Sequence, residues 1–363
     1  MALQALAAAA LGRVEVARAD ANDDTVSQRA LVFPRDHGAH SGTRIEWWYA
    51  TGWLRPDPQA APVGWQLTFF RSRTGLAAEL PGRFAPRQLL FAHAAVSDVA
   101  ARRHRDAQRL SRWSGDPSQP EVHAAAHDTD VVLGAWSFVR GADGRYSARL
   151  PAAEAGFTLQ LVLAPTQAVL LQGQHGHSRK GPQPQQASHY YTQPQLAVQA
   201  QLALDGRSST LAGRGWLDHE WSNELLAPGA VGWDWIGINL HDGGALTAFV
   251  LRRRDGSVVW AGGSHRPAGG AVRVFTPDEV QFQPLREWTS PATGARYPVR
   301  WAITTPAGAF ELEALFEAQE LDSSASTGAI YWEGLSALRE RDGREIGLGY
   351  LEMTGRKTPL KLG

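Results

Sequence analysis

The chain of 363 residues contains no cysteine, which excludes disulfide bonds, thiol nucleophiles, iron–sulfur clusters and cysteine-bound zinc. Net charge is absent too, because 36 Lys and Arg balance 36 Asp and Glu. A neutral chain creates no long-range field that attracts nucleic acid or anionic lipid, so we expect no nucleic-acid partner. Apolar runs of about 18 residues are also missing, and we therefore expect no membrane-spanning helix.

Two further catalytic signatures are missing. The sequence has no Gly-x-Ser-x-Gly elbow, which argues against a serine hydrolase of the α/β type. It has no glycine-rich phosphate loop either, since Gly262-Gly263 and Gly269-Gly270 are typical of turns. What the sequence does have is 14 tryptophans, and their large apolar faces suit protein cores and ligand walls alike.

The N-terminus is rich in Ala and Leu over residues 2–11, and small residues follow at Ala17, Ala19 and Ala21. This pattern is typical of the end of a secretory signal and its cleavage site, although the usual basic segment is missing. We interpret residues 1–29 as a signal remnant and linker, and we expect a periplasmic or secreted protein. A short Ala-rich helix is the alternative.

Period-two alternation dominates the rest of the chain. In the first such run, one face carries Ile45, Trp47, Tyr49, Thr51 and Trp53, and the other face carries Glu46, Trp48 and Ala50. Asp-Gly turns at 143, 205, 255 and 342 separate many short runs of this kind. The pattern predicts an all-β protein whose antiparallel sheets close, or nearly close, into barrels. We expect one domain at 30–222 and a second at 223–363, because Ala227-Pro228-Gly229 interrupts the alternation.

The richest candidate for chemistry is Asp218-His219-Glu220-Trp221 followed by Gly232-Trp233-Asp234-Trp235. Asp234 shares a strand face with Ile236 and Ile238, and an ionised carboxylate on an apolar face is costly. The pKa of Asp234 is therefore expected to be raised, as a general acid at neutral pH requires. A carboxylate that is merely hydrogen-bonded to a buried Trp or His is an equally good interpretation.

A second cluster contains His37 and His40, with Glu46 just downstream. Two histidines and a carboxylate could hold a metal ion. No helix presents the two histidines on one face, however, so we favour a polar plug at a barrel entrance that bonds backbone groups. We expect neither a metal nor a cofactor.

Several stretches resemble one known family. They are FPRDHGAHSGTRIEWWYATGWL (33–54), GWQLTFFRSR (64–73), LDHEWSNELL (217–226), GWDWIGINLHDGGALTAF (232–249), YWEG (331–334) and GLGYLEMTG (347–355). The chain is similar to the family that joins the carotenoid 1,2-hydratases, also called hydroxyneurosporene synthases, with the AttH-like secreted proteins. The AttH-like branch looks closer.

This resemblance implies two consecutive lipocalin-like β-barrels with a hydrophobic cavity near their junction. In the hydratases, an acidic residue with a nearby His and Trp protonates an isolated C=C of an isoprenoid, and water adds to the tertiary cation. His219 and Trp221 match the His-x-Trp element of that motif. Asp234 is our first choice for the proton donor, and Asp218 is the second.

Two functions remain open from the sequence. The first is a cofactor-independent hydro-lyase acting on a large apolar ligand, with Asp234 as the acid and His219 positioning either the acid or the water. The residues expected to bind the ligand are aromatic, and cation–π contacts worth roughly 0.5–2 kcal/mol each would stabilise a carbocation: Trp47, Tyr49, Trp221, Trp233 and Trp235. The second is a non-catalytic lipid carrier that serves an ABC transporter. A metal hydrolase built on His37 and His40 is a distant third.

Overall fold

The computed structural model describes residues 26, 28–75, 87–116, 118–224 and 226–360. Apart from residues 26, 28 and 29, the expected signal remnant and linker lies outside this part of the chain. Within the described residues, no helix is long and apolar enough to cross a membrane.

The first sheet is antiparallel and contains strands from the N-terminal part of the chain. Its main path runs β4-β3-β2-β1-β13-β12-β9-β8-β7-β6-β5, and two short strands pair with β12 off this path. Strand β4 lies beside β5 and β6, so the sheet curls until its two edges meet. The strands are β1 (Ile45–Arg55), β2 (Val63–Arg73), β3 (Gln88–Asp98), β4 (Arg103–Trp113), β5 (Val122–Ala124), β6 (Asp130–Leu133), β7 (Trp136–Arg140), β8 (Tyr146–Ala152), β9 (Phe157–Ala164), β10 (Leu170–Leu171), β11 (His177–Arg179), β12 (Ala187–Leu204) and β13 (Arg207–Ser222).

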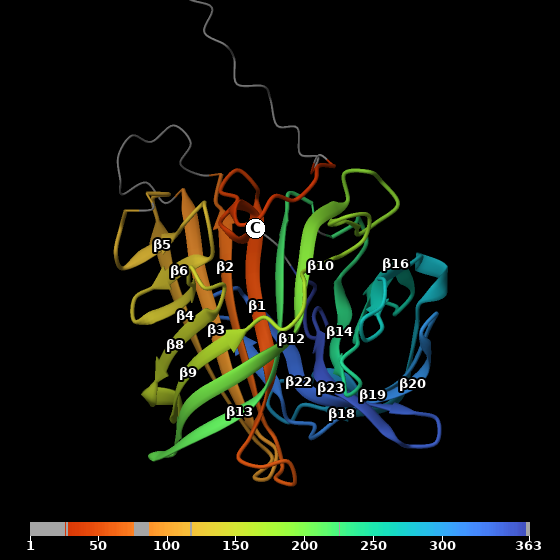
Figure 1. Ribbon diagram of the computed structural model, residues 1–363. Helices are drawn as coiled ribbons and strands as arrows, with labels where there is room; N and C mark the ends of the chain where they lie inside the picture. Colours follow the sequence, from red (N-terminus) through yellow and green to blue (C-terminus); the bar gives the residue numbers. More distant parts are fainter. Residues whose placement is uncertain (1–25, 27, 76–86, 117, 225, 361–363) are drawn as a thin grey trace, which may run out of the picture.

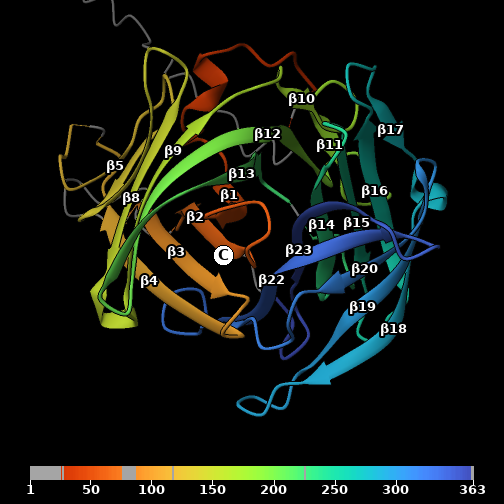
Figure 2. The same cartoon turned by 60° about the horizontal axis from the view of Figure 1, so that its bottom comes forward.

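The second sheet follows the order β17-β16-β15-β14-β23-β22-β20-β19-β18, with β21 paired to β22. It curls beside the first sheet (Figure 2). Its strands are β14 (Gly232–Leu240), β15 (Ala245–Arg252), β16 (Val258–Arg266), β17 (Arg273–Phe275), β18 (Gln281–Thr289), β19 (Arg296–Thr305), β20 (Gly308–Ala314), β21 (Glu320–Ser323), β22 (Ala329–Glu340) and β23 (Glu345–Met353). Short 3₁₀ turns are η1 (Arg35–His37), η2 (Ala153–Ala155) and η3 (Pro277–Glu279). The predicted all-β fold with two lipocalin-like barrels is confirmed.

The two faces of each sheet have different partners, because successive side chains of a strand point to opposite sides. In β1, Trp48 and Ala50 point into the core of the first barrel. Tyr49 and Trp53 point the other way and pack with Trp235 from β14. The barrels therefore contact each other through the outer faces of β1, β13, β14, β22 and β23, which lie side by side at the centre of the molecule (Figure 1).

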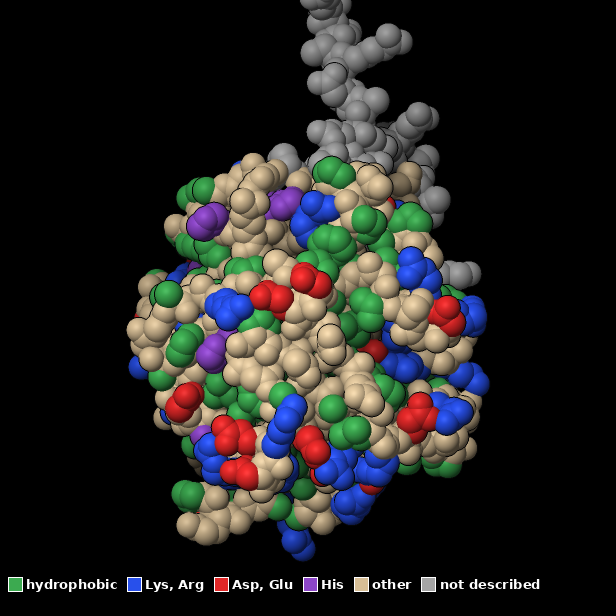
Figure 3. Space-filling model, turned by 90° about the vertical axis from the view of Figure 1, so that its right-hand side faces the viewer, with side chains coloured by type: hydrophobic (Ala, Val, Ile, Leu, Met, Phe, Trp, Pro, Cys, Tyr) green, Lys and Arg blue, Asp and Glu red, His purple; other side chains and the backbone are tan. Residues whose placement is uncertain are grey.

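The outer surface agrees with the balanced charge. On the face seen in Figure 3, which looks onto the side of the second sheet, basic and acidic side chains are interspersed and hydrophobic side chains are scattered.

Packing between the barrels should contribute strongly to stability. Leu335 on β22 is fully buried in the cluster between the sheets. Leu335→Ala removes buried methyl groups and leaves a cavity, so we expect the free energy of unfolding to fall by about 2–5 kcal/mol. Urea unfolding of the variant measures this change. Val162→Ala is the control, because Val162 is 42% exposed; equal effects of the two substitutions would contradict the interpretation.

Candidate active site between the two barrels

An apolar cavity of about 250 Å³ lies between the outer faces of the two sheets. Strands β1, β2 and β3 form one wall, and β14, β22 and β23 form the other. The segment 354–360, which follows β23, closes one side with Thr354, Thr358 and Leu360. Aromatic rings line much of the cavity: Trp47, Tyr49, Phe70, Phe91, Trp233 and Trp235. Such a site suits an apolar ligand that needs few polar contacts.

Two glutamates stand next to each other on one wall of this cavity. Glu333 on β22 and Glu352 on β23 are direct partners in the antiparallel register, and both line the cavity. Burial, followed by the charge of Glu352, raises the pKa of Glu333 well above its usual range. Burial raises the pKa of Glu352 to about 7, although a hydrogen bond from Trp233 opposes the shift. Two neighbouring carboxyls in a buried site oppose each other's ionisation, which favours the protonated form of the pair.

Glu333 also has unused hydrogen-bonding capacity. Its side chain is 1% exposed, and its Oε1 atom has no hydrogen-bond partner among the described residues. An ionised oxygen in that position would carry a large desolvation cost. Glu333 is therefore best described as a neutral carboxylic acid facing an apolar cavity, the state in which a carboxyl can donate a proton.

Asp218 on β13 is a third carboxyl that lines the cavity. It accepts hydrogen bonds from the Tyr190 hydroxyl at 2.8 Å and from Thr192 Oγ1 at 2.5 Å. Burial raises the pKa of Asp218 to about 7 despite these two donors. Neighbouring Glu220 differs, because it forms an ion pair with Lys180 at 2.9 Å.

His93 on β3 also lines the cavity, and its hydrogen bonds connect the first barrel to the second. Its Nδ1 lies 2.7 Å from the Tyr331 hydroxyl, and its Nε2 lies 2.9 Å from Ser326 Oγ. Burial lowers the pKa of His93 to about 4, so the ring is neutral at pH 7. A neutral imidazole beside an apolar cavity can orient a hydroxyl or a water molecule.

The structure brings five of the sequence-predicted residues to the cavity, and they are Trp47, Tyr49, Asp218, Trp233 and Trp235. Three others, Asp234, His219 and Trp221, lie on the opposite faces of their strands and do not line it. Alternation explains the split, because Asp218 and His219 are neighbours on β13 and must point to opposite sides.

Asp234 is therefore not placed to protonate a ligand in this cavity. Its carboxylate accepts from Arg252 Nε at 3.1 Å and from Arg356 Nη2 at 2.6 Å. These two guanidinium partners occupy both oxygens of the carboxylate on the side away from the cavity. The sequence did not reveal these partners, because Arg356 is far away in the chain, on the segment after β23.

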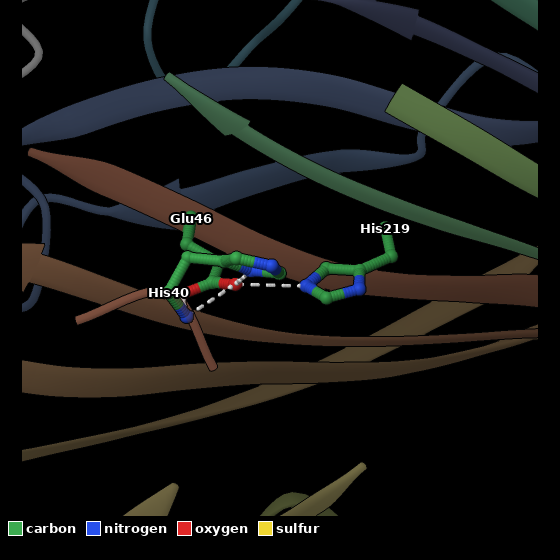
Figure 4. Close-up of side chains that lie close together, drawn as sticks. All are labelled: His40, Glu46 and His219. Carbon is green, nitrogen blue, oxygen red and sulfur yellow. Dashed lines mark hydrogen bonds and ion pairs between the residues drawn. The ribbon is translucent and has the colours of Figure 1, made fainter. Parts of the chain in front are cut away.

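His219 and Trp221 belong to a buried polar cluster in the first barrel. Figure 4 shows His219 beside His40 and Glu46. His219 Nε2 lies 2.9 Å from Glu46 Oε1, and His40 Nδ1 lies 2.7 Å from the same oxygen. Arg71 Nε donates to Glu46 Oε2 at 2.8 Å. Trp221 stacks on the His40 ring, with the two planes 7° apart.

Possible metal-ligand atoms of His40, Glu46 and His219 lie within 4.8 Å of one another. The ring nitrogens that face Glu46 sit at hydrogen-bond distance, and the other ring nitrogens contact Asp36 and Tyr191. Arg71 already supplies a positive charge to Glu46. The residues therefore fit a hydrogen-bond network in which every member already has a partner better than they fit a metal site. Such a network agrees with the polar plug expected from the sequence. His37 uses its Nδ1 on Tyr191 rather than on Glu46.

The charges of this cluster follow from its partners. Burial acts to raise the pKa of Glu46, but Arg71 and His40 outweigh it and leave that pKa well below its usual range. Burial lowers the pKa of His219 to about 4 even though Glu46 opposes the shift. Glu46 is thus ionised and His219 neutral at pH 7.

Glu333, Glu352 and His93 were missed from the sequence. Glu333 shares a strand face with Tyr331 and Leu335, and Glu352 shares one with Tyr350. The same signal drew attention to Asp234, so it could have found these glutamates. The alternation could not have shown which carboxylates form an ion pair with an arginine.

Removing the charge of Glu46 should destabilise the fold. Glu46→Gln leaves the Arg71 guanidinium buried without its counterion, and we expect a loss of about 3–5 kcal/mol in the free energy of unfolding at pH 7. The depressed pKa of Glu46 means that its stabilisation is present above about pH 4.5 and is lost as the pH falls through its folded-state pKa. Chemical denaturation at several pH values measures both effects. Exposed Glu121→Gln serves as the control, and a Glu46→Gln loss no larger than that of the control would contradict the assignment.

Substitution of Glu352 should change the free energy of unfolding in the opposite direction. Its pKa is raised on folding, so its destabilising effect is absent below about pH 4.5 and complete above about pH 7. Glu352→Gln should therefore raise the free energy of unfolding by about 1–3 kcal/mol at pH 8 and leave it almost unchanged at pH 4. Denaturation curves at the two pH values provide the measurement. A destabilised variant at pH 8 would contradict the prediction.

Comparisons with known proteins place these features in a family. The family model described as AttH-like matches residues 24–356. The solved structure of an AttH candidate from Nitrosomonas europaea has a TM-score of 0.83 and 46% sequence identity, and the match covers 92% of this chain and 99% of that chain. Kievitone hydratase from Nectria haematococca has a TM-score of 0.66 at 14% identity, with 91% and 94% of the two chains covered, a likeness that shows the fold alone. No curated protein matches the chain. The extent of the family match and the high identity to the Nitrosomonas structure show that the chain belongs to the AttH-like family.

Proposed function

We propose that this protein is a cofactor-independent hydratase that protonates a C=C of an apolar, isoprenoid-like ligand held between the two barrels. The observation that carries the proposal is the buried Glu333 carboxyl, which faces an apolar, aromatic-lined cavity next to Glu352 and whose pKa is raised by that burial. A carboxylic acid kept neutral at pH 7 by burial is the group that such chemistry needs. A hydratase of similar fold, kievitone hydratase, supports the choice of reaction class.

In the proposed reaction, Glu333 gives its proton to one carbon of the double bond, and a tertiary cation forms at the other carbon. Water adds to that cation while Glu352, as the carboxylate, accepts the proton released by the water. The proton then returns from Glu352 to Glu333, so the net change is the addition of one water molecule. The faces of Trp47, Trp233 and Trp235 and the negative charge of the pair stabilise the cation.

The size of the cavity constrains the substrate. Sites for drug-sized ligands are about 300–1,000 Å³, and this cavity measures about 250 Å³. It suits a short isoprenoid, or the end group of a longer one, better than an entire carotenoid. We therefore propose a terpenoid-sized substrate.

Conversion of geraniol, farnesol and squalene in H₂¹⁸O tests the proposal. We expect the wild-type protein to incorporate one labelled oxygen into at least one of them, as detected by mass spectrometry. Glu333→Gln cannot donate a proton, so turnover should fall by at least about 10²-fold, while ligand affinity from tryptophan fluorescence stays similar. Turnover should also decrease as the pH rises above the pKa of the donor. Glu340→Gln, at the outer end of the same strand, is the control.

The same experiment tests a second function, a carrier of apolar ligands, which the predominantly aromatic lining of the cavity favours. Tight binding by the wild type and by Glu333→Gln, with no labelled product from either, would contradict the hydratase and support the carrier. If the protein is a carrier, we further propose that it is exported and that it serves an ABC transporter, as expected from the sequence.

A further inference from the structure

A second cavity, of about 210 Å³, lies beside the segment 354–360. Five cationic side chains line it, and we call them together the basic pocket: Arg252, Arg254, Arg296, Arg356 and Lys357. The carboxylates in contact with them are Glu287, which pairs with Arg296, and Asp234, which pairs with Arg252 and Arg356. Five positive charges against two negative charges leave a net charge of +3.

Asp234 fixes the orientation of two of these arginines. Arg356 forms a two-point contact with it through Nε and Nη2, at 3.3 and 2.6 Å. Arg252 donates to Asp234 through Nε and to the Thr354 carbonyl through Nη2. The Nη1 groups of both arginines have no recorded partner among the described residues. An orientation fixed by a buried carboxylate leaves those donors preorganised for a further acceptor.

Arg254 adds a cation without a carboxylate. It lies in the turn between β15 and β16, is exposed, and has no ion pair within the described part of the chain. Arg252, by contrast, is only 6% exposed, so the pocket combines a buried guanidinium with an accessible one. Planar guanidinium groups of this kind match the oxygens of phosphate and diphosphate.

The basic pocket and the apolar cavity share one wall. Gly355 lines both spaces. On one side of this wall, Thr358 and Leu360 face the apolar cavity, and on the other side Arg356 and Lys357 face the basic pocket. The Leu360 amide donates to the Val231 carbonyl at 2.9 Å, which ties the segment to the chain ahead of β14.

We propose that the basic pocket binds an oxyanion of the phosphate or diphosphate type. This site goes beyond the proposed hydratase, because its residues take no part in the proton transfer. The anion is either a free phosphate compound or the head group of an amphiphile whose isoprenoid part occupies the apolar cavity. In both cases the charge of the basic pocket provides the recognition.

Isothermal titration calorimetry with three probes tests the proposal: pyrophosphate, geraniol and geranyl diphosphate. The variant is Arg254→Ala combined with Arg296→Ala, because both side chains are exposed and the fold should survive. Arg207→Ala is the matched control, since Arg207 is an exposed arginine on a hairpin of the first barrel. We expect saturable pyrophosphate binding to the wild type, weakened by at least about tenfold in the double variant and unchanged in the control.

The probes also distinguish the two sources of the anion. Geranyl diphosphate that binds far more tightly than either pyrophosphate or geraniol supports the head-group form, and equal binding of geranyl diphosphate and pyrophosphate supports the free-anion form. Absence of saturable binding by both anionic probes overturns the proposal, as does an equal loss of affinity in the control. Geraniol binding reports on the apolar cavity alone, so failure of the proposed function remains distinguishable from failure of this site.

Discussion

The central constraint on this molecule is the low polarity of the space between its two barrels. Each sheet buries its inner face in its own core, and each also turns an apolar outer face toward the other. Within the residues that the structure describes, Glu333, Glu352 and Asp218 project into the intervening cavity and are buried there without an ion pair to a cation, whereas Glu220 pairs with Lys180. The desolvation cost of the ionised form therefore raises the pKa of both Glu333 and Glu352 and favours their neutral forms.

The same residue types behave differently elsewhere in the fold because their partners differ. Glu46 is fully buried, yet Arg71 and His40 keep it ionised. Asp234 is equally buried and is held by two arginines. Glu333, Glu352 and Asp218, which line the cavity between the barrels, have no such partner among the described residues. Burial alone thus does not favour the protonated form of a carboxyl, whereas burial without a counterion does.

Strand β13 separates these two environments. Asp218 points to the cavity, where burial raises its pKa, and His219 points into the first barrel, where it bonds Glu46. A residue motif that looks continuous in the sequence therefore serves two different places. The cluster around Glu46 stabilises the barrel end, and the carboxyls on the other side offer chemistry.

Much of the fold could be predicted from the sequence, because a period of two residues is sufficient to define strands and their faces. The alternation separated Trp47 and Tyr49 from Glu46 and Trp48 correctly. It could not show which face of a strand meets the other barrel, since both faces of β1 carry large apolar side chains. The ion pair of Asp234 with Arg356 depends on a contact between distant segments, so the choice of acid failed there. The cavity-facing Glu333 and Glu352 become recognisable only when β22 and β23 are placed beside β1.

The most direct test is to observe the protonation state of the cavity carboxyls themselves. Infrared difference spectroscopy at pH 7 distinguishes a protonated carboxyl from a carboxylate by its C=O stretch. The wild-type protein should show protonated carboxyl absorption that titrates away at higher pH and is weaker in Glu333→Gln, while Asp218 and Glu352 account for the remainder. A spectrum with fully ionised carboxylates at pH 7, identical in wild type and variant, would contradict the account.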